Sequence, residues 1–70
     1  MIGISTIWET SDSVELERSC NEDESVGTSY GLQTLSDVIA DECERMRQEG
    51  YDLKHAFIAN KKLVFFWEQE

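Results

Sequence analysis

The side chains that could perform nucleophilic or metal chemistry in this sequence are two cysteines and one histidine, Cys20, Cys43 and His55. A structural zinc site takes four nitrogen or sulfur ligands, commonly in short pairs along the chain, and these three are widely separated. A Cys–His nucleophile needs a group that activates the thiol, whereas nearby carboxylates disfavour the thiolate. We therefore expect no enzyme activity, no metal and no cofactor, with Cys20 and Cys43 as reduced thiols and Cys43 in the core.

An acidic segment, residues 21–25, carries the oxygen ligands that calcium prefers but lacks the spacing of a calcium loop. If Asn21 held the first position of an EF-hand loop, Val26 would replace the required glycine and Leu32 the bidentate glutamate. The glycine-containing turn at 27–31 lacks the Gly-Lys-Ser/Thr ending of a phosphate-binding loop. We interpret these residues as a surface loop followed by a hinge.

The strongest feature of the composition is its charge. Fifteen acidic and six basic side chains give a net charge of −9 in 70 residues. Residues 1–52 hold thirteen acids and three bases (net −10), whereas residues 53–70 hold two acids and three bases (net +1). This balance argues against direct binding to nucleic acid or to an anionic membrane, since both require basic side chains.

Three acids, Asp37, Asp41 and Glu44, are spaced so that neighbours on a helix lie roughly 5–6 Å apart. Phosphates along one DNA strand repeat at a comparable distance, within a factor of about 1.5. A carboxylate array can therefore occupy the basic nucleic-acid channel of another protein. A merely solubilising surface is the alternative, in which Arg45 pairs with Asp41 and Arg47 with Glu44, but solubility needs a net charge of only about 2–8.

Alternation of side chains predicts an N-terminal hairpin of strands at 2–8 and 14–18, joined by a turn at 10–13. Apolar residues at three- and four-residue intervals then predict an amphipathic helix that begins near Ser29 or Thr34 and ends before Gly50. The apolar stripe of this helix comprises Leu32, Leu35, Val38, Ile39, Cys43 and Met46.

The segments 54–59 and 62–67 flank Asn60 and Lys61, which predicts a second hairpin with a tight turn. Leu63, Phe65 and Trp67 point to one face of its last strand and Val64 and Phe66 to the other. One helix covers only one face of a sheet. The other face is therefore expected either to be wrapped by N-terminal segments or to form an exposed apolar patch.

These elements predict a single α+β domain over residues 1–70. Its four-stranded antiparallel sheet has one amphipathic helix on one face, in the order ββαββ. No signal peptide, lipidation motif or membrane span is recognised, so we expect a cytoplasmic protein, in the host cell if a phage encodes it.

In size and charge the chain is similar to the small acidic inhibitors of phages and mobile elements, including anti-CRISPR and anti-restriction proteins. This similarity implies a protein-binding inhibitor whose partner has a basic, nucleic-acid-binding surface. Charge and exposed aromatic anchors would come from Glu15, Glu17, Glu22, Asp23, Glu24, Asp37, Asp41, Glu44, Phe66 and Trp67. In the alternative hypothesis the apolar C-terminal hairpin makes the protein a homodimer or an adaptor, and the acids only keep it in solution.

Overall fold

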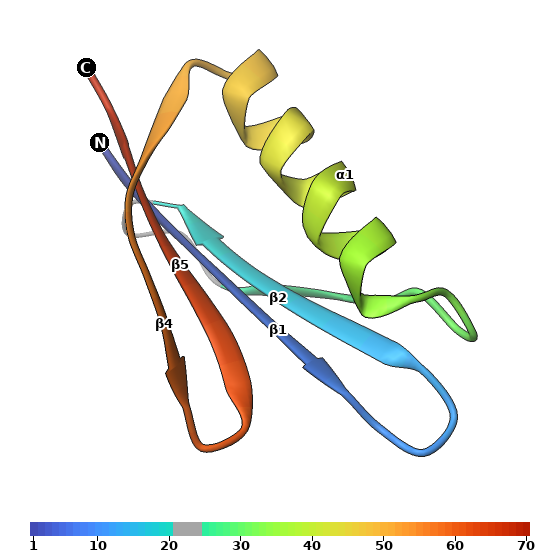
Figure 1. Cartoon of the computed structure of the whole chain (residues 1–70). Helices are drawn as coiled ribbons and strands as arrows, with labels where there is room; N and C mark the ends of the chain where they lie inside the picture. The colour runs from blue at the N-terminus through green and yellow to red at the C-terminus, as the bar shows by residue number, and fades with distance from the viewer. Residues whose placement is uncertain (21–24) are drawn as a thin grey trace.

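One helix lies across one face of an antiparallel sheet in the computed structural model, which describes residues 1–20 and 25–70 (Figure 1). The elements follow the order β1 (Ile2–Glu9), β2 (Val14–Cys20), β3 (Val26–Ser29), α1 (Leu35–Gln48), β4 (Tyr51–Ala59) and β5 (Lys62–Gln69). The strands are arranged β3-β2-β1-β5-β4, with β1 in the centre. The α+β class, the antiparallel sheet and the helix on one face are thus confirmed.

The number of strands and their order were predicted wrongly: the sheet has five strands, and the chain order is βββαββ. The additional strand β3 falls in the segment expected to be a loop, and it pairs with β2 from Glu15↔Ser29 to Arg18↔Val26. All four of its residues are exposed. Backbone pairing with β2 forms this strand, so its side chains carry no buried alternation that a sequence could reveal.

Local signals define the ends of α1. Thr34 caps the N-terminus, because its Oγ1 accepts a hydrogen bond from the Asp37 amide at 3.3 Å. Gly50 follows the C-terminus with a positive φ of 89°, the left-handed conformation that glycine adopts readily. Both boundaries confirm the prediction. Leu32 is the exception, since it precedes the cap and is 91% exposed.

The C-terminal hairpin also has its predicted turn. Asn60 and Lys61 have positive φ angles of 51° and 63°, as the two central residues of a type I′ turn require. The hairpin pairs Ala59 with Lys62 next to the turn. Within β4 the register shifts between Leu53 and His55, where a β-bulge leaves an extra residue.

The core lies between α1 and the sheet. Side chains from every strand except β3 meet two helix residues there, and the buried apolar set is Ile7, Val14, Leu16, Val38, Met46, Tyr51, Phe65 and Trp67. Phe65 and Trp67 share this face, as the sequence predicted. No helix in the part of the chain that the structure describes is long and apolar enough to cross a membrane.

Candidate protein interface

The face of the sheet that α1 leaves uncovered, called here the open face, carries an apolar patch. Strand β1 directs Gly3, Ser5 and Ile7 toward α1, and it therefore directs Ile2, Ile4, Thr6 and Trp8 to the opposite side. Val64 and Phe66 of β5 share the open face, because they are paired with Thr6 and Ile4. The described N-terminal strands lie beside the C-terminal hairpin within the sheet and not over this face, so the exposed apolar patch, one of the two expected alternatives, is present.

Strand β4 extends the apolar patch to the edge of the sheet. Phe57 is paired with Val64 and is 52% exposed, and His55 is paired with Phe66. The His55 and Phe66 rings meet edge to face with their centroids 6.5 Å apart. The ring contact orients Phe66 while leaving it partly exposed, so this side chain is available to a partner.

Acidic side chains border the patch on its other side. Register pairs Glu15 with Trp8 and Glu17 with Thr6, which places both glutamates on the open face. The Ser13 hydroxyl donates a hydrogen bond to Glu15 at 3.0 Å. The surface thus has an aromatic and aliphatic centre with carboxylates along β2, a distribution typical of protein–protein interfaces.

A basic group also lies on the open face. The Lys62 ammonium sits 4.4 Å from the centre of the Trp8 ring, in cation–π geometry. This contact covers part of the indole and holds Lys62 over the sheet. The patch that remains accessible is therefore concentrated around Ile4, Phe57 and Phe66.

The helix presents a second acidic surface that points away from the sheet. Asp37, Asp41 and Glu44 are all exposed there. The expected pair between Arg45 and Asp41 is present, with 3.6 Å between Nη2 and Oδ2. Arg47 instead donates from Nε to the Cys43 carbonyl at 3.4 Å.

The acids of the predicted site that the structure describes lie on two separate surfaces. Glu15 and Glu17 lie on the open face of the sheet, whereas the helix acids are exposed on the outside of α1. The physical reason is alternation: Val14 and Leu16 face the helix, so the glutamates between and after them must face away. Glu22, Asp23 and Glu24 lie outside the described residues.

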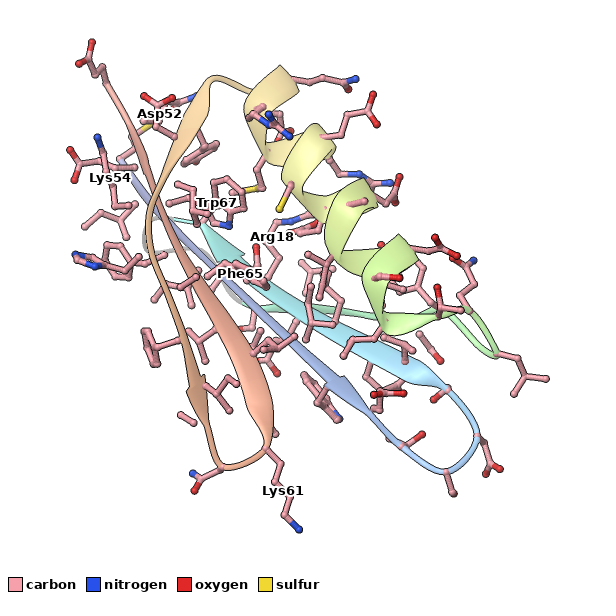
Figure 2. All side chains as sticks on the ribbon, viewed as in Figure 1. Arg18, Asp52, Lys54, Lys61, Phe65 and Trp67 are labelled. Carbon is pink, nitrogen blue, oxygen red and sulfur yellow. The ribbon has the colours of Figure 1, made fainter. Side chains whose placement is uncertain are left out.

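Trp67 was wrongly expected to be an exposed anchor. Its side chain is 1% exposed and lies between β5 and the helix, close to Phe65 (Figure 2). The indole N–H donates to the Ser5 hydroxyl at 3.0 Å. Because Trp67 alternates with Phe66, only one of the two can lie on the open face.

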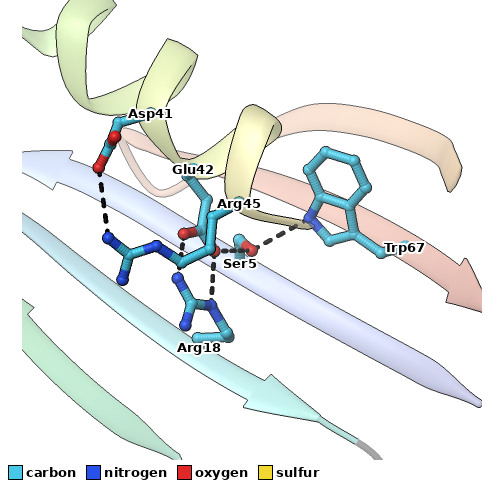
Figure 3. Close-up of polar contacts among 6 residues, drawn as sticks. All are labelled: Ser5, Arg18, Asp41, Glu42, Arg45 and Trp67. Atoms are coloured by element: carbon cyan, nitrogen blue, oxygen red, sulfur yellow. Dashed lines mark hydrogen bonds and ion pairs between the residues drawn. The ribbon is translucent and has the colours of Figure 1, made fainter. Parts of the chain in front are cut away.

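The structure reveals a buried polar cluster that sequence reasoning missed (Figure 3). Glu42 is completely buried on the inner side of α1, where Arg18 donates to both of its carboxylate oxygens, from Nε at 2.8 Å and from Nη2. The Ser5 hydroxyl donates to the same carboxylate at 2.6 Å and accepts from Trp67. The cluster thus joins β1, β2, β5 and α1.

These contacts set the protonation of the cluster. Burial by itself would raise the pKa of Glu42, but hydrogen bonds from Arg18 and Ser5 outweigh it, so the pKa lies below the usual value of 4.5. The hydrogen bond to Glu42 raises the pKa of Arg18. Glu42 is therefore an ionised carboxylate whose charge is matched within the fold.

A sequence signal for this cluster existed. Glu42 stands four residues from both Val38 and Met46, so helical spacing alone places it on the buried stripe. Arg18 alternates with Val14 and Leu16 on the inner face of β2. An acid on one apolar surface and a base on another predict a buried ion pair once it is known that the two surfaces pack together.

Among the residues that the structure describes, no group of three or more His, Cys, Asp or Glu side chains could hold a metal ion. Cys20 and Cys43 are both free thiols, and burial raises the pKa of Cys43, which disfavours its thiolate. Comparisons of this chain with protein-family models, with curated proteins and with solved structures gave no match.

Proposed function

We propose that this protein is a non-catalytic inhibitor of the anti-defence type that binds a larger protein and blocks its basic, nucleic-acid-handling surface. The observation that carries this proposal is the open face, which combines partly exposed apolar side chains with Glu15 and Glu17. Phe66 is the central anchor of the contact, and Ile4 and Phe57 surround it. Interfaces commonly have such an aromatic centre and a polar rim.

The charge of the molecule favours a basic partner. A net charge of −9 attracts a positively charged surface from a distance and accelerates encounter at low salt. Glu15 and Glu17 would meet basic side chains at the margin of the apolar contact, which also fixes the orientation of binding. Because Asp37, Asp41 and Glu44 point away from the open face, they contribute to long-range attraction.

A basic protein surface that accepts carboxylates can also accept the phosphates of nucleic acid, since both groups are recognised by Lys and Arg. Occupation by this protein would exclude nucleic acid sterically and would neutralise the surface. Inhibition then requires only tight binding, and no chemical step.

Affinity capture with matched baits tests the proposal. Immobilised wild-type protein and the variants Phe66→Ala and Glu15→Lys/Glu17→Lys are exposed to a lysate of the host cells at low and at high salt. A partner of the open face is expected on the wild-type bait at low salt, and is reduced on both variants. Leu32→Ala serves as the matched control, because Leu32 is exposed and lies outside the open face.

The captured protein is then purified, and its affinity for nucleic acid is measured by fluorescence anisotropy during titration with the inhibitor. We expect stoichiometric release of nucleic acid by the wild-type protein and little release by Phe66→Ala. The proposal is overturned if the partner keeps its nucleic acid while the inhibitor is bound, or if all four baits capture the same proteins.

A further inference from the structure

Strand β4 forms one edge of the sheet. Among the strands that the structure describes it is paired with β5 alone, and eight of its nine residues are exposed. The opposite edge, β3, has only four residues with mostly small or polar side chains, Val26–Ser29. Short edge strands resist pairing with other chains, whereas a long exposed edge offers a row of backbone hydrogen-bonding groups.

Apolar side chains line β4 on both faces of the sheet. Phe57 lies on the open face, and its neighbour Ile58, which is 73% exposed, lies on the helix side. The bulge at Lys54 interrupts the first half of the strand, and bulges with lysine are typical protection of an edge. The second half, residues 55–59, is regular and has no such protection.

The two ends of the C-terminal hairpin differ in charge: the open end carries Asp52 and Glu68 with Lys54 beside them, and the turn carries lysine (Figure 2). Asp52 is paired with Glu68 at the open end of the hairpin, and Lys61 projects from the turn at the other end. An antiparallel copy of the hairpin would bring its turn beside Asp52, so that opposite charges meet twice by symmetry. A parallel copy would bring like charges together.

We infer that a second copy of this chain pairs with β4, antiparallel and centred on Phe57, to join two five-stranded sheets into one. Opposed residues of an antiparallel pair share a face. Phe57 therefore meets Phe57 of the second copy on the open face, and Ile58 meets Ala56 on the helix side. Ala59 of each copy then lies opposite His55 of the other, which brings the turn residue Lys61 to the end of the partner strand that carries Asp52, within reach of a long side chain.

The distribution of charge favours self-association through β4 over self-association through β1, β2 or α1. Residues 1–52 carry a net charge of −10, so contacts through β1, β2 or α1 would bring acidic surfaces together. The last 18 residues carry +1 and can approach a second copy without net repulsion. This pairing does not depend on the proposed inhibitor function.

Sedimentation equilibrium over a range of protein concentrations measures the pairing. We expect a reversible dimer for the wild-type protein, and Ile58→Lys should weaken it by roughly tenfold or more, because it places a charge within the paired edge. Leu32→Lys, an apolar-to-lysine change at an even more exposed position away from β4, should leave the dimer intact. Circular dichroism of each variant establishes that it is folded.

Charge reversal tests the orientation. Asp52→Lys and Lys61→Glu each place like charges at both contacts, and each should weaken self-association by roughly tenfold. An equimolar mixture of the two variants should restore the dimer, because both contacts then join opposite charges. Asp12→Lys, in the β1–β2 turn, controls for the change in net charge.

A wild-type protein that remains monomeric at every concentration overturns the inference. A dimer that withstands Ile58→Lys overturns it as well. A dimer that Ile58→Lys disrupts but that the mixture of Asp52→Lys and Lys61→Glu does not restore overturns the antiparallel orientation. In each case the capture experiment on the open face still tests the inhibitor function separately.

Discussion

The two faces of the sheet differ in what they bury. Under α1, the carboxylate of Glu42 and the hydroxyl of Ser5 are completely buried, together with most of the Arg18 side chain. On the open face, one residue along β1 from Ser5, the apolar side chain of Ile4 is 37% exposed. The covered face therefore contains an ionised group away from water, while the open face leaves apolar groups in contact with it.

Each face has a different consequence for the molecule. A buried carboxylate loses its hydration, and only well-placed hydrogen bonds offset that cost. The contacts of Glu42 with Arg18 and Ser5 require one position of α1 over β1 and β2, so we regard the cluster as a device that fixes helix placement. The open face is held by exposed contacts such as Lys62 over the Trp8 ring, and its free energy can be lowered further by a partner that covers its apolar side chains.

The largest expected effect comes from breaking the cluster on the covered face. Arg18→Met leaves the charge of Glu42 buried without a counter-charge and should lower the free energy of unfolding by about 3–5 kcal/mol. Arg45→Met removes the exposed pair with Asp41 and should cost less than about 1 kcal/mol. Urea denaturation of both variants measures the difference, and equal losses would contradict the role of burial.

Protonation of Glu42 provides a milder way to break the same cluster. Its pKa is lowered in the folded state, so its stabilising contribution is complete above the usual glutamate value of 4.5 and is lost as pH falls through the lowered pKa. The free energy of unfolding of the wild-type protein minus that of Glu42→Gln should therefore shrink below pH 4.5. A difference that is constant from neutral to acidic pH would show that Glu42 is not ionised in the fold.

On the open face, the expected loss is in binding. Phe66→Ala should weaken capture of the partner by roughly thirtyfold, or about 2 kcal/mol, the size of a typical interface hot spot. Its effect on unfolding should be smaller than that of Arg18→Met, since Phe66 is only partly buried. Isothermal titration calorimetry with the purified partner measures the loss, with Leu32→Ala as the control. A variant that binds as tightly as the wild type would remove Phe66 from the interface.

The smallest expected effects distinguish the acids of the open face from those of α1. Glu15→Gln/Glu17→Gln should reduce affinity by about fivefold at low salt, because these carboxylates border the contact. Asp37→Asn/Asp41→Asn/Glu44→Asn should slow association by about twofold, since charges farther than roughly 10 Å from the contact are screened. Stopped-flow association at several salt concentrations separates the two effects. If the helix variant loses more affinity, α1 is the interface instead.

Much of the fold could be predicted because its signals are local. Thr34 caps α1 through a bond to a residue three positions away, and Asn60 with Lys61 forms a turn between adjacent strands. Strand β3 could not be predicted in this way, because its pairing with β2 involves the backbone and leaves its side chains exposed. Of the residues predicted for the site, Glu15, Glu17 and Phe66 lie on the same face of the sheet.

Other parts of the site depend on which face of the sheet the helix covers. Both faces of the C-terminal hairpin are apolar, so its pattern alone does not select one. In β2, by contrast, one side is apolar with Val14 and Leu16 and the other is acidic with Glu15 and Glu17. The helix packs on the apolar side of β2. Because β1 pairs with both β2 and β5, the register then fixes which face of the C-terminal hairpin the helix covers.

The sequence by itself therefore determined the alternating strands, the capped helix, the two hairpins and the uneven charge, because each arises from residues near one another in the chain. Only the tertiary structure decided that Trp67 is buried while Phe66 is accessible, that Glu42 lies inside with Arg18, and that the acids form two surfaces. These outcomes depend on which surfaces meet, and that is set by the packing of α1 against strands distant in sequence.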